Sequence, residues 1–267
     1  MSNSTLNRKI ICQVYDSNNV VDSICTHYSL SITDLDTELL TCIYNHKSEN
    51  RHIKALFNIK ADNVYTFGSK FVIKMTMDYG MDGLVLDDVN ESNVSNIIKL
   101  LQAIVRLPPP YNFKWDIFFR FNKTTITDLC AIFKNIKTVQ LFFLVSGIIV
   151  PDRLLQSMTD YGFEPHLIMM ESEEQNINFQ LDNVKNNKFG GMFCKNVEIC
   201  KIIYQPLKHS LVTHTNHLDY PTSRFVKDLE VSSIIDAYSS NNVSTINPNK
   251  KTPTAVSVVV NIELLPS

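Results

Sequence analysis

Short apolar runs recur along the chain, and most are followed by a stretch in which apolar residues return every three or four positions. The runs are rich in β-branched and aromatic residues and, after the closely spaced first two, begin at intervals of roughly 25 to 35 residues, a pattern typical of βαβ units on a parallel sheet. Eight strands are predicted, at Lys9–Tyr15, Cys25–Ser31, Ala55–Lys60, Gly83–Asp87, Lys114–Phe121, Val139–Ser146, His166–Met170 and Gly191–Lys195.

Amphipathic stretches between and after these runs predict the helices. They lie at Asp36–His46, Tyr65–Tyr79, Asn93–Arg106, Thr125–Lys134, Pro151–Tyr161, Asn176–Asn187 and Val197–His209. Only "DSNNVVDS" separates the first two strands, which is too short for a full helix. Eight such units close a barrel, so we expect an α/β fold with a single (β/α)8 TIM barrel over residues 1–213. Residues 214–267 are expected to form a C-terminal extension or arm.

Composition narrows the function classes. A hydrophobic content of 44% supports a large core, while 25 basic and 27 acidic residues without long charge runs favour neither nucleic acid nor an anionic membrane as partner. No run approaches the roughly 20 apolar residues of a membrane span, and the polar start lacks a signal-peptide segment. The six cysteines include no CxxC pair, and no glycine-rich phosphate motif occurs. We therefore expect no metal and no cofactor.

The stretch "MDYGMDGLVLDDVNES", residues 77–92, carries the candidate chemistry. It is typical of a helix end, a glycine turn, a short apolar strand and then a group of acids. Barrel enzymes present catalytic carboxylates at such strand ends. Asp87 and Asp88 are adjacent on a strand whose side chains alternate, so Asp88 is expected to point away from the barrel axis if Asp87 points inward.

Three segments in the right order resemble glycoside hydrolase family 18, the chitinases and chitinase-like lectins. They are "KIICQVYDSNNVVDSICTHYSLSI", "YGMDGLVLDD" and "QLDNVKNNKFGGMFCK", which are similar to the family's first two strands, fourth strand and last repeat. The resemblance covers about residues 9–200 and implies a (β/α)8 barrel. It also implies a Cys12–Cys25 disulfide if the protein matures in an oxidising compartment, as the secreted members do.

The resemblance places the family's catalytic motif on residues 82–89 and shows what differs. Val85 stands at the first inner acid, Asp87 at the acid nearest the catalytic glutamate, and Val89 at that glutamate itself. In the family the glutamate protonates the glycosidic oxygen, while the neighbouring aspartate orients the substrate's acetamido group, which is the nucleophile. Valine can do neither. We therefore expect a barrel without glycosidase activity, in which Asp87 is a remnant with a structural role.

Three functions remain open at this point. The first is a structural, storage or self-assembling protein, whose β-prone run "TAVSVVVNIEL" adds a strand to a neighbouring molecule. The second is a lectin for N-acetylglucosamine-containing glycans, with Asp87, Tyr15, Tyr28 and Phe57 as ligand-binding candidates. The third is a divergent hydrolase that uses Asp87 with Asp88 or Glu91.

Further motifs have simpler interpretations. His27 is expected to be satisfied by a polar neighbour in the core, and the acidic stretch "ESEEQ", residues 171–175, to be a solvated loop. His209, His214 and His217 lack an acidic partner at helical spacing and are expected to be solvent-exposed. Bulky or apolar residues stand where the family has small, polar or acidic ones, at Lys60, Val85, Val89, Phe143 and Leu144. They predict a mouth closed by apolar packing, with no pocket for a sugar ring above Asp87.

Overall fold

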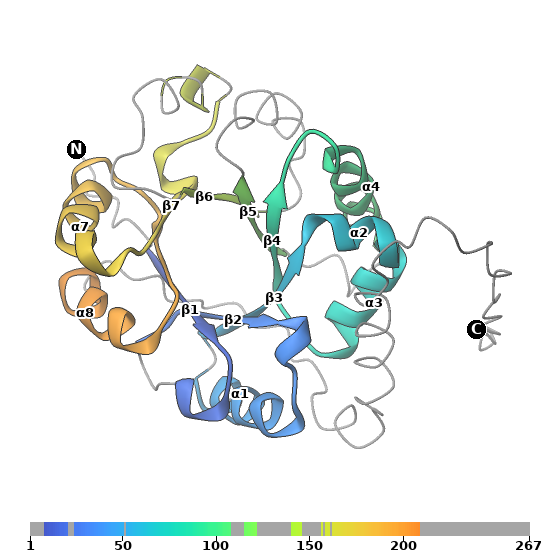
Figure 1. Ribbon diagram of the computed structural model, residues 1–267, viewed down its shortest axis with the longest axis horizontal. Coiled ribbons are helices and arrows are strands. Elements are labelled where there is room, and N and C mark those ends of the chain that lie inside the picture. Colours follow the sequence, from blue (N-terminus) through green and yellow to red (C-terminus); the bar gives the residue numbers. More distant parts are fainter. Residues whose placement is uncertain are drawn as a thin grey trace, which may run out of the picture.

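The computed structural model describes residues 8–20, 24–50, 52–107, 115–121, 140–145, 156, 158–160 and 162–208. Eight parallel strands form a closed barrel in sequence order, with β8 pairing back onto β1, and helices surround it (Figure 1). The strands are β1 Lys9–Val14, β2 His27–Ser31, β3 Lys54–Lys60, β4 Gly83–Val89, β5 Asp116–Phe121, β6 Gln140–Val145, β7 Ile168–Glu171 and β8 Gly191–Cys194. The predicted TIM barrel and its eight strands are confirmed.

The helices follow the predicted order, with one difference. They are α1 Thr37–Glu49, α2 Ala61–Phe67, α3 Ser69–Asp78, α4 Val94–Val105, α7 Ile177–Asn186 and α8 Val197–Leu207. Short 3-10 helices lie at Ser17–Asn19, Ile32–Asp34, Pro165–Leu167 and Glu174–Asn176. The helix predicted at Tyr65–Tyr79 starts earlier and is divided into α2 and α3 at Gly68, whose φ of 78° is a left-handed conformation that favours glycine.

Some predictions fall outside the described residues. These are the helix Thr125–Lys134, most of Pro151–Tyr161, the histidines at 209, 214 and 217, and the extension 214–267. Among the residues that the structure does describe, no helix is long and apolar enough to cross a membrane.

Side-chain caps set where two of the helices begin. The Asp36 carboxylate accepts a hydrogen bond from the Leu39 backbone at 2.6 Å at the start of α1. The Asn196 side chain accepts one from the Ile199 backbone at 2.9 Å at the start of α8. Each cap satisfies a backbone N–H that the first helical turn would otherwise leave unpaired.

The alternation of side chains along the strands divides the apolar residues into two layers. The inner layer fills the barrel and consists of Ile11, Leu56, Val85, Phe118, Phe142, Leu144, Met169 and Phe193. The outer layer is larger and packs the other face of the strands against the helices. Phe118 and Phe142 stack within the inner layer with ring centroids 4.6 Å apart. The barrel centre is therefore packed with side chains, as TIM barrel interiors are.

Gly83 allows the close approach of β4 and β5. A Cβ atom at this position would lie 1.9 Å from the backbone oxygen of Asp116, its partner on β5. Such a contact requires the backbone to move. The glycine of the "MDGL" motif therefore lets β4 and β5 pair closely at the amino end of β4, which is the end opposite to the acids.

Candidate functional site at the carboxyl ends of the strands

Four charged residues form a network at the carboxyl end of the barrel, and we call them the mouth network: Asp87 on β4, Arg120 on β5, Glu171 at the end of β7 and Lys195 just after β8. Arg120 Nη1 lies 2.8 Å from Asp87 Oδ1, and Arg120 Nη2 lies 3.3 Å from Glu171 Oε1. Lys195 Nζ lies 2.9 Å from the same Glu171 oxygen. Positive and negative groups thus alternate across the mouth.

Arg120 lies at the centre of the mouth network. Its guanidinium lies over the Phe193 ring of the inner layer, 4.7 Å from the ring centroid, which is a cation–π contact. The bond to Asp87 has hydrogen-bond geometry, whereas the approach to Glu171 is a close ion pair without it. Arg120 therefore covers the apolar interior and lies against two carboxylates, one on the neighbouring strand β4 and one on β7.

The surroundings of Asp87 act on its pKa in opposite directions. Burial raises the pKa of Asp87 above its usual range, while the Arg120 cation and a hydrogen bond from Asn58 oppose that change. Its side chain is 18% exposed. Asp87 is thus a paired carboxylate at the edge of solvent, and its structural role stays a prediction.

The end of β4 departs from a regular strand directly after Asp87. The pairing of β4 with β5 shifts register between Leu86 and Val89, and Asp88 has a φ of 59°. Asp88 is exposed, and Val89 is fully buried in the outer layer among residues that face the helices. A bulge of this kind re-aims the side chains that follow it. The residue aligned with the catalytic glutamate therefore does not point into the mouth.

Two of the aromatic ligand-binding candidates are corrected by the structure. Tyr28 and Phe57 are fully buried in the outer layer, where Tyr28 contacts the His46 ring and Phe57 contacts the Tyr79 ring. They cannot stack on a ligand at the mouth because they occupy the wrong face of β2 and β3. Tyr15, which directly follows β1, is 47% exposed and is the aromatic candidate that remains.

The expectation of an apolar mouth is also corrected. Of the residues expected to close it, only Val85 and Leu144 belong to the packed inner layer, whereas Phe143 and Val89 face the helices and Lys60 is exposed. The mouth network lies above that centre, so the mouth is charged. Glu171, expected in a solvated loop, is instead 4% exposed at the end of β7. Whether a sugar-sized pocket exists above Asp87 stays a prediction.

Sequence reasoning missed Arg120 altogether. The signal that identifies it is its place in "IFFRF", an otherwise apolar run in which Arg120 has the same strand parity as the inward-facing Phe118. A charged residue on the inward face of a barrel strand needs a partner of opposite sign. Asp87, on the neighbouring strand, provides that charge.

A second polar cluster lies at the opposite end of the barrel interior. His27 Nε2 lies 3.0 Å from Asp116 Oδ2, Thr26 Oγ1 lies 2.8 Å from His27 Nδ1, and Lys54 Nζ lies 2.8 Å from Asp116 Oδ2. Burial lowers the pKa of His27 to about 4 against the raising effect of Asp116, with Lys54 and Lys9 adding to the lowering. Both ring nitrogens of His27 have a polar partner, as expected, and buried groups at this end of a TIM barrel serve stability.

Solved structures with the same architecture include sugar-cleaving and other enzymes. A family 18 chitinase from Cycas revoluta, solved with (GlcNAc)3, is 10% identical, with a TM-score of 0.52 over 76% of this chain and 98% of its own. A fungal family 18 endo-β-N-acetylglucosaminidase is 11% identical, with a TM-score of 0.52 over 74% and 98%. The chain has a chitinase-like (β/α)8 fold. Tryptophan synthase from M. tuberculosis gives 0.51 over 78% and 94% at 10% identity, so these similarities concern the fold alone.

No protein-family model matches the sequence, and no curated protein is significantly similar to it.

Proposed function

We propose that this chain is a chitinase-like barrel without glycosidase activity that has a structural, storage or self-assembly role. The observation that carries the proposal is the end of β4, where Val85 packs inside the barrel and Val89 packs outside it. A family 18 mechanism needs a glutamate that reaches the glycosidic oxygen and an aspartate that orients the acetamido group. Here Asp87 is held by Arg120, and no acid follows it into the mouth from position 89.

The electrostatics of the mouth support the same proposal. A general acid works best as a protonated group with a raised pKa near the operating pH. Asp87 has a raised pKa, but its oxygen accepts a hydrogen bond from Arg120 at 2.8 Å, and this bond favours the ionised form. Glu171 is likewise within 3.3 Å of Arg120 and 2.9 Å of Lys195. Both carboxylates thus lie against cations of the mouth network.

The self-assembly part of the proposal rests on residues 254–264, "TAVSVVVNIEL", which have high β-propensity and a single charge. Light scattering on the full chain at several concentrations measures the assembly. A chain ended after His214 and a full-length Val258→Lys, Val260→Lys variant are the matched comparisons. We expect both to form assemblies of fewer copies than the unmodified chain; an equal number of copies per particle for all three would exclude this run as the contact.

A second candidate function is glycan binding at the mouth, and the exposed Tyr15 ring favours it. Aromatic faces at the edge of a polar site are common sugar contacts. Calorimetric titration with chitin oligomers, on the unmodified chain and on Tyr15→Ala, tests this alternative. Binding that weakens in the variant would support a lectin, whereas the absence of heat at millimolar ligand would remove it.

A further inference from the structure

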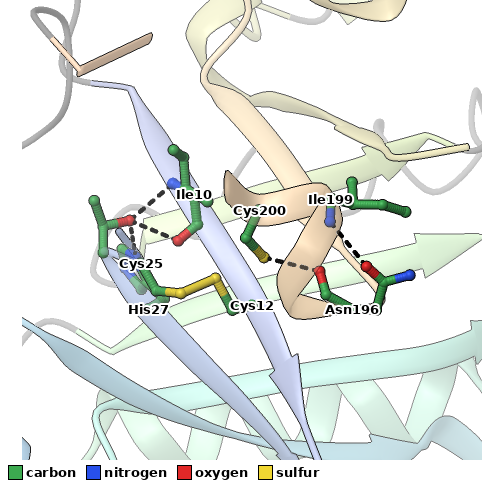
Figure 2. The surroundings of a disulfide bond; sticks show 8 residues. Ile10, Cys12, Cys25, His27, Asn196, Ile199 and Cys200 are labelled. Carbon is green, nitrogen blue, oxygen red and sulfur yellow. Dashed lines mark hydrogen bonds between the residues drawn. A yellow bond between two sulfur atoms is a disulfide. The ribbon is translucent and has the colours of Figure 1, made fainter. Parts of the chain in front are cut away.

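Four cysteines that are distant in sequence gather in the outer layer where the barrel closes. Cys12 lies on β1, Cys25 just before β2, Cys194 at the end of β8 and Cys200 on α8. Cys12 and Cys25 form a disulfide, the pairing that the family resemblance implied, and Cys12 is the register partner of Cys194. The sulfur of Cys200 lies within 4.8 Å of both bridge sulfurs (Figure 2). A free thiol thus lies beside a disulfide.

The cluster is closed to solvent. Cys25 is 3% exposed, and the other three cysteines are fully buried. A reagent in solution has little access to the bridge, so the thiols that can react with it are those of the cluster itself. The sulfurs of Cys12, Cys25 and Cys200 lie close together, but those of Cys12 and Cys25 are bonded to each other and cannot act as thiolate ligands of a metal. The reaction open to this cluster is therefore thiol–disulfide exchange.

The two free thiols of the cluster differ in their surroundings. Burial raises the pKa of Cys194 well above its usual range, and a hydrogen bond with Cys200 adds to this effect. The Cys200 thiol donates a hydrogen bond to the Asn196 backbone oxygen, at 3.2 Å, and rotation about its Cα–Cβ bond releases it from this partner. Cys200 is also the one that lies within reach of both bridge sulfurs. These facts identify Cys200 as the attacking group.

We propose that Cys200 is an alternative partner in the Cys12–Cys25 disulfide, and that the cluster is an internal thiol–disulfide exchange site. The Cys200 sulfur, as thiolate, attacks the sulfur of Cys12 or Cys25. A new bond to Cys200 forms while the Cys12–Cys25 bond breaks, and the released cysteine takes up the proton that Cys200 lost. The number of disulfides and thiols is unchanged, so no external oxidant or reductant is consumed.

The exchange changes what the cross-link holds together. The Cys12–Cys25 bridge closes a separation of 13 residues between two strands that already pair with each other. A bridge from Cys200 to Cys12 instead joins α8 to β1, the last and first regular elements of the described barrel. Such a bridge would add a covalent link at the place where β8 pairs back onto β1 and closes the barrel. The exchange would therefore link α8, the last described helix before residues 209–267, covalently to β1.

The test follows the free thiols in the full-length chain. The protein is held in the absence of oxygen at about pH 8.5, near the usual pKa of a thiol, for about a day, which exceeds the seconds to hours of ordinary reshuffling. Samples are quenched in acid, alkylated under denaturing conditions and digested without reduction for mass spectrometry. We expect alkylation of Cys200 to fall while that of Cys25 or Cys12 rises equally. Alkylation that stays on Cys200 and never appears on either bridge cysteine would overturn the proposal.

Two matched variants assign the attacking group. In Cys194→Ser the exchange should persist, whereas in Cys200→Ser the bridge cysteines should stay fully protected from alkylation. Exchange that is lost in Cys194→Ser and kept in Cys200→Ser would overturn the assignment. Cys42→Ser, which changes a cysteine outside the cluster, should give the unmodified pattern. Fluorescence of the buried Trp115 checks that each variant is folded.

Cys25→Ser identifies the acceptor on β1. Folded in the presence of glutathione disulfide, which is the oxidant for this step, this variant should form a Cys12–Cys200 bond, with two molecules of reduced glutathione released per bond. A Cys12 joined to Cys194, or to glutathione with Cys200 free, would contradict the proposed geometry.

Discussion

The buried His27–Asp116 pair predicts a specific loss of stability in weak acid. His27 is fully buried, and this burial lowers its pKa to about 4 despite the raising effect of Asp116, with a smaller lowering from the Lys54 cation. Burial opposes ionisation of Asp116, but the His27 hydrogen bond and Lys54 outweigh it and hold its pKa below the usual range. The folded pair is therefore a neutral imidazole on an ionised carboxylate.

The sign of the pH dependence follows from these two pKa values. Between pH 6.5 and pH 4 the unfolded chain binds a proton at His27 and the folded chain does not, so the free energy of unfolding falls as the pH falls. The slope is at most about 1.4 kcal/mol per pH unit, and the total is about 3 kcal/mol across the window. The contribution of Asp116 is lost only below its unfolded pKa, near 3.8, and does not enter this window.

The variant His27→Gln isolates this contribution. Its amide still donates to Asp116 but binds no proton, so the destabilisation that it causes at pH 7 should shrink by about 3 kcal/mol on approaching pH 4. Urea unfolding followed by fluorescence of Trp115, the single tryptophan, gives both free energies at each pH. The pH effects of the other titrating groups, including the raised pKa of Asp87, cancel in the difference. A difference that does not change with pH would contradict the lowered pKa of His27 in the folded chain.

Three substitutions test the packing around the site. Val89→Glu should lower the free energy of unfolding by roughly 3 kcal/mol or more, because it buries an acid in the outer layer. It should give no chitinase activity, since that acid does not enter the mouth, and an active, stable variant would contradict this. Arg120→Met should cost about 2 kcal/mol in urea unfolding, since the buried Glu171 carboxylate loses a cation; an unchanged midpoint would show that the pairing is inconsequential. Gly83→Ala should cost about 3 kcal/mol or more, because its Cβ would clash with the Asp116 backbone, and wild-type stability would refute the close approach.

The barrel could be predicted from the sequence because its strands carry their own signals. Each apolar run is separated from the next by a helical pattern or a turn, and the order of the runs fixes the order of the strands. The split of the second predicted helix at Gly68 was missed because a single glycine within an amphipathic pattern is compatible with a continuous helix.

The candidate site was less accessible to sequence reasoning because it depends on where each side chain points. Alternation places Asp87 inside correctly, but the register shift after Leu86 reverses the expected direction of Val89. Tyr28 and Phe57 were assigned to the mouth by residue type alone, without their strand parity. The Arg120–Glu171 contact joins strands that are not neighbours, so no local pattern encodes it.

The most direct test of the central claim is turnover of a fluorogenic chitobioside by the full-length chain, measured beside an Asp87→Asn variant prepared in the same way. We expect no release of fluorophore above the blank from either protein, because the position aligned with the proton-donating glutamate is Val89, which is buried in the outer layer. Release by the unmodified chain that disappears in Asp87→Asn would contradict it and would assign catalysis to the mouth network.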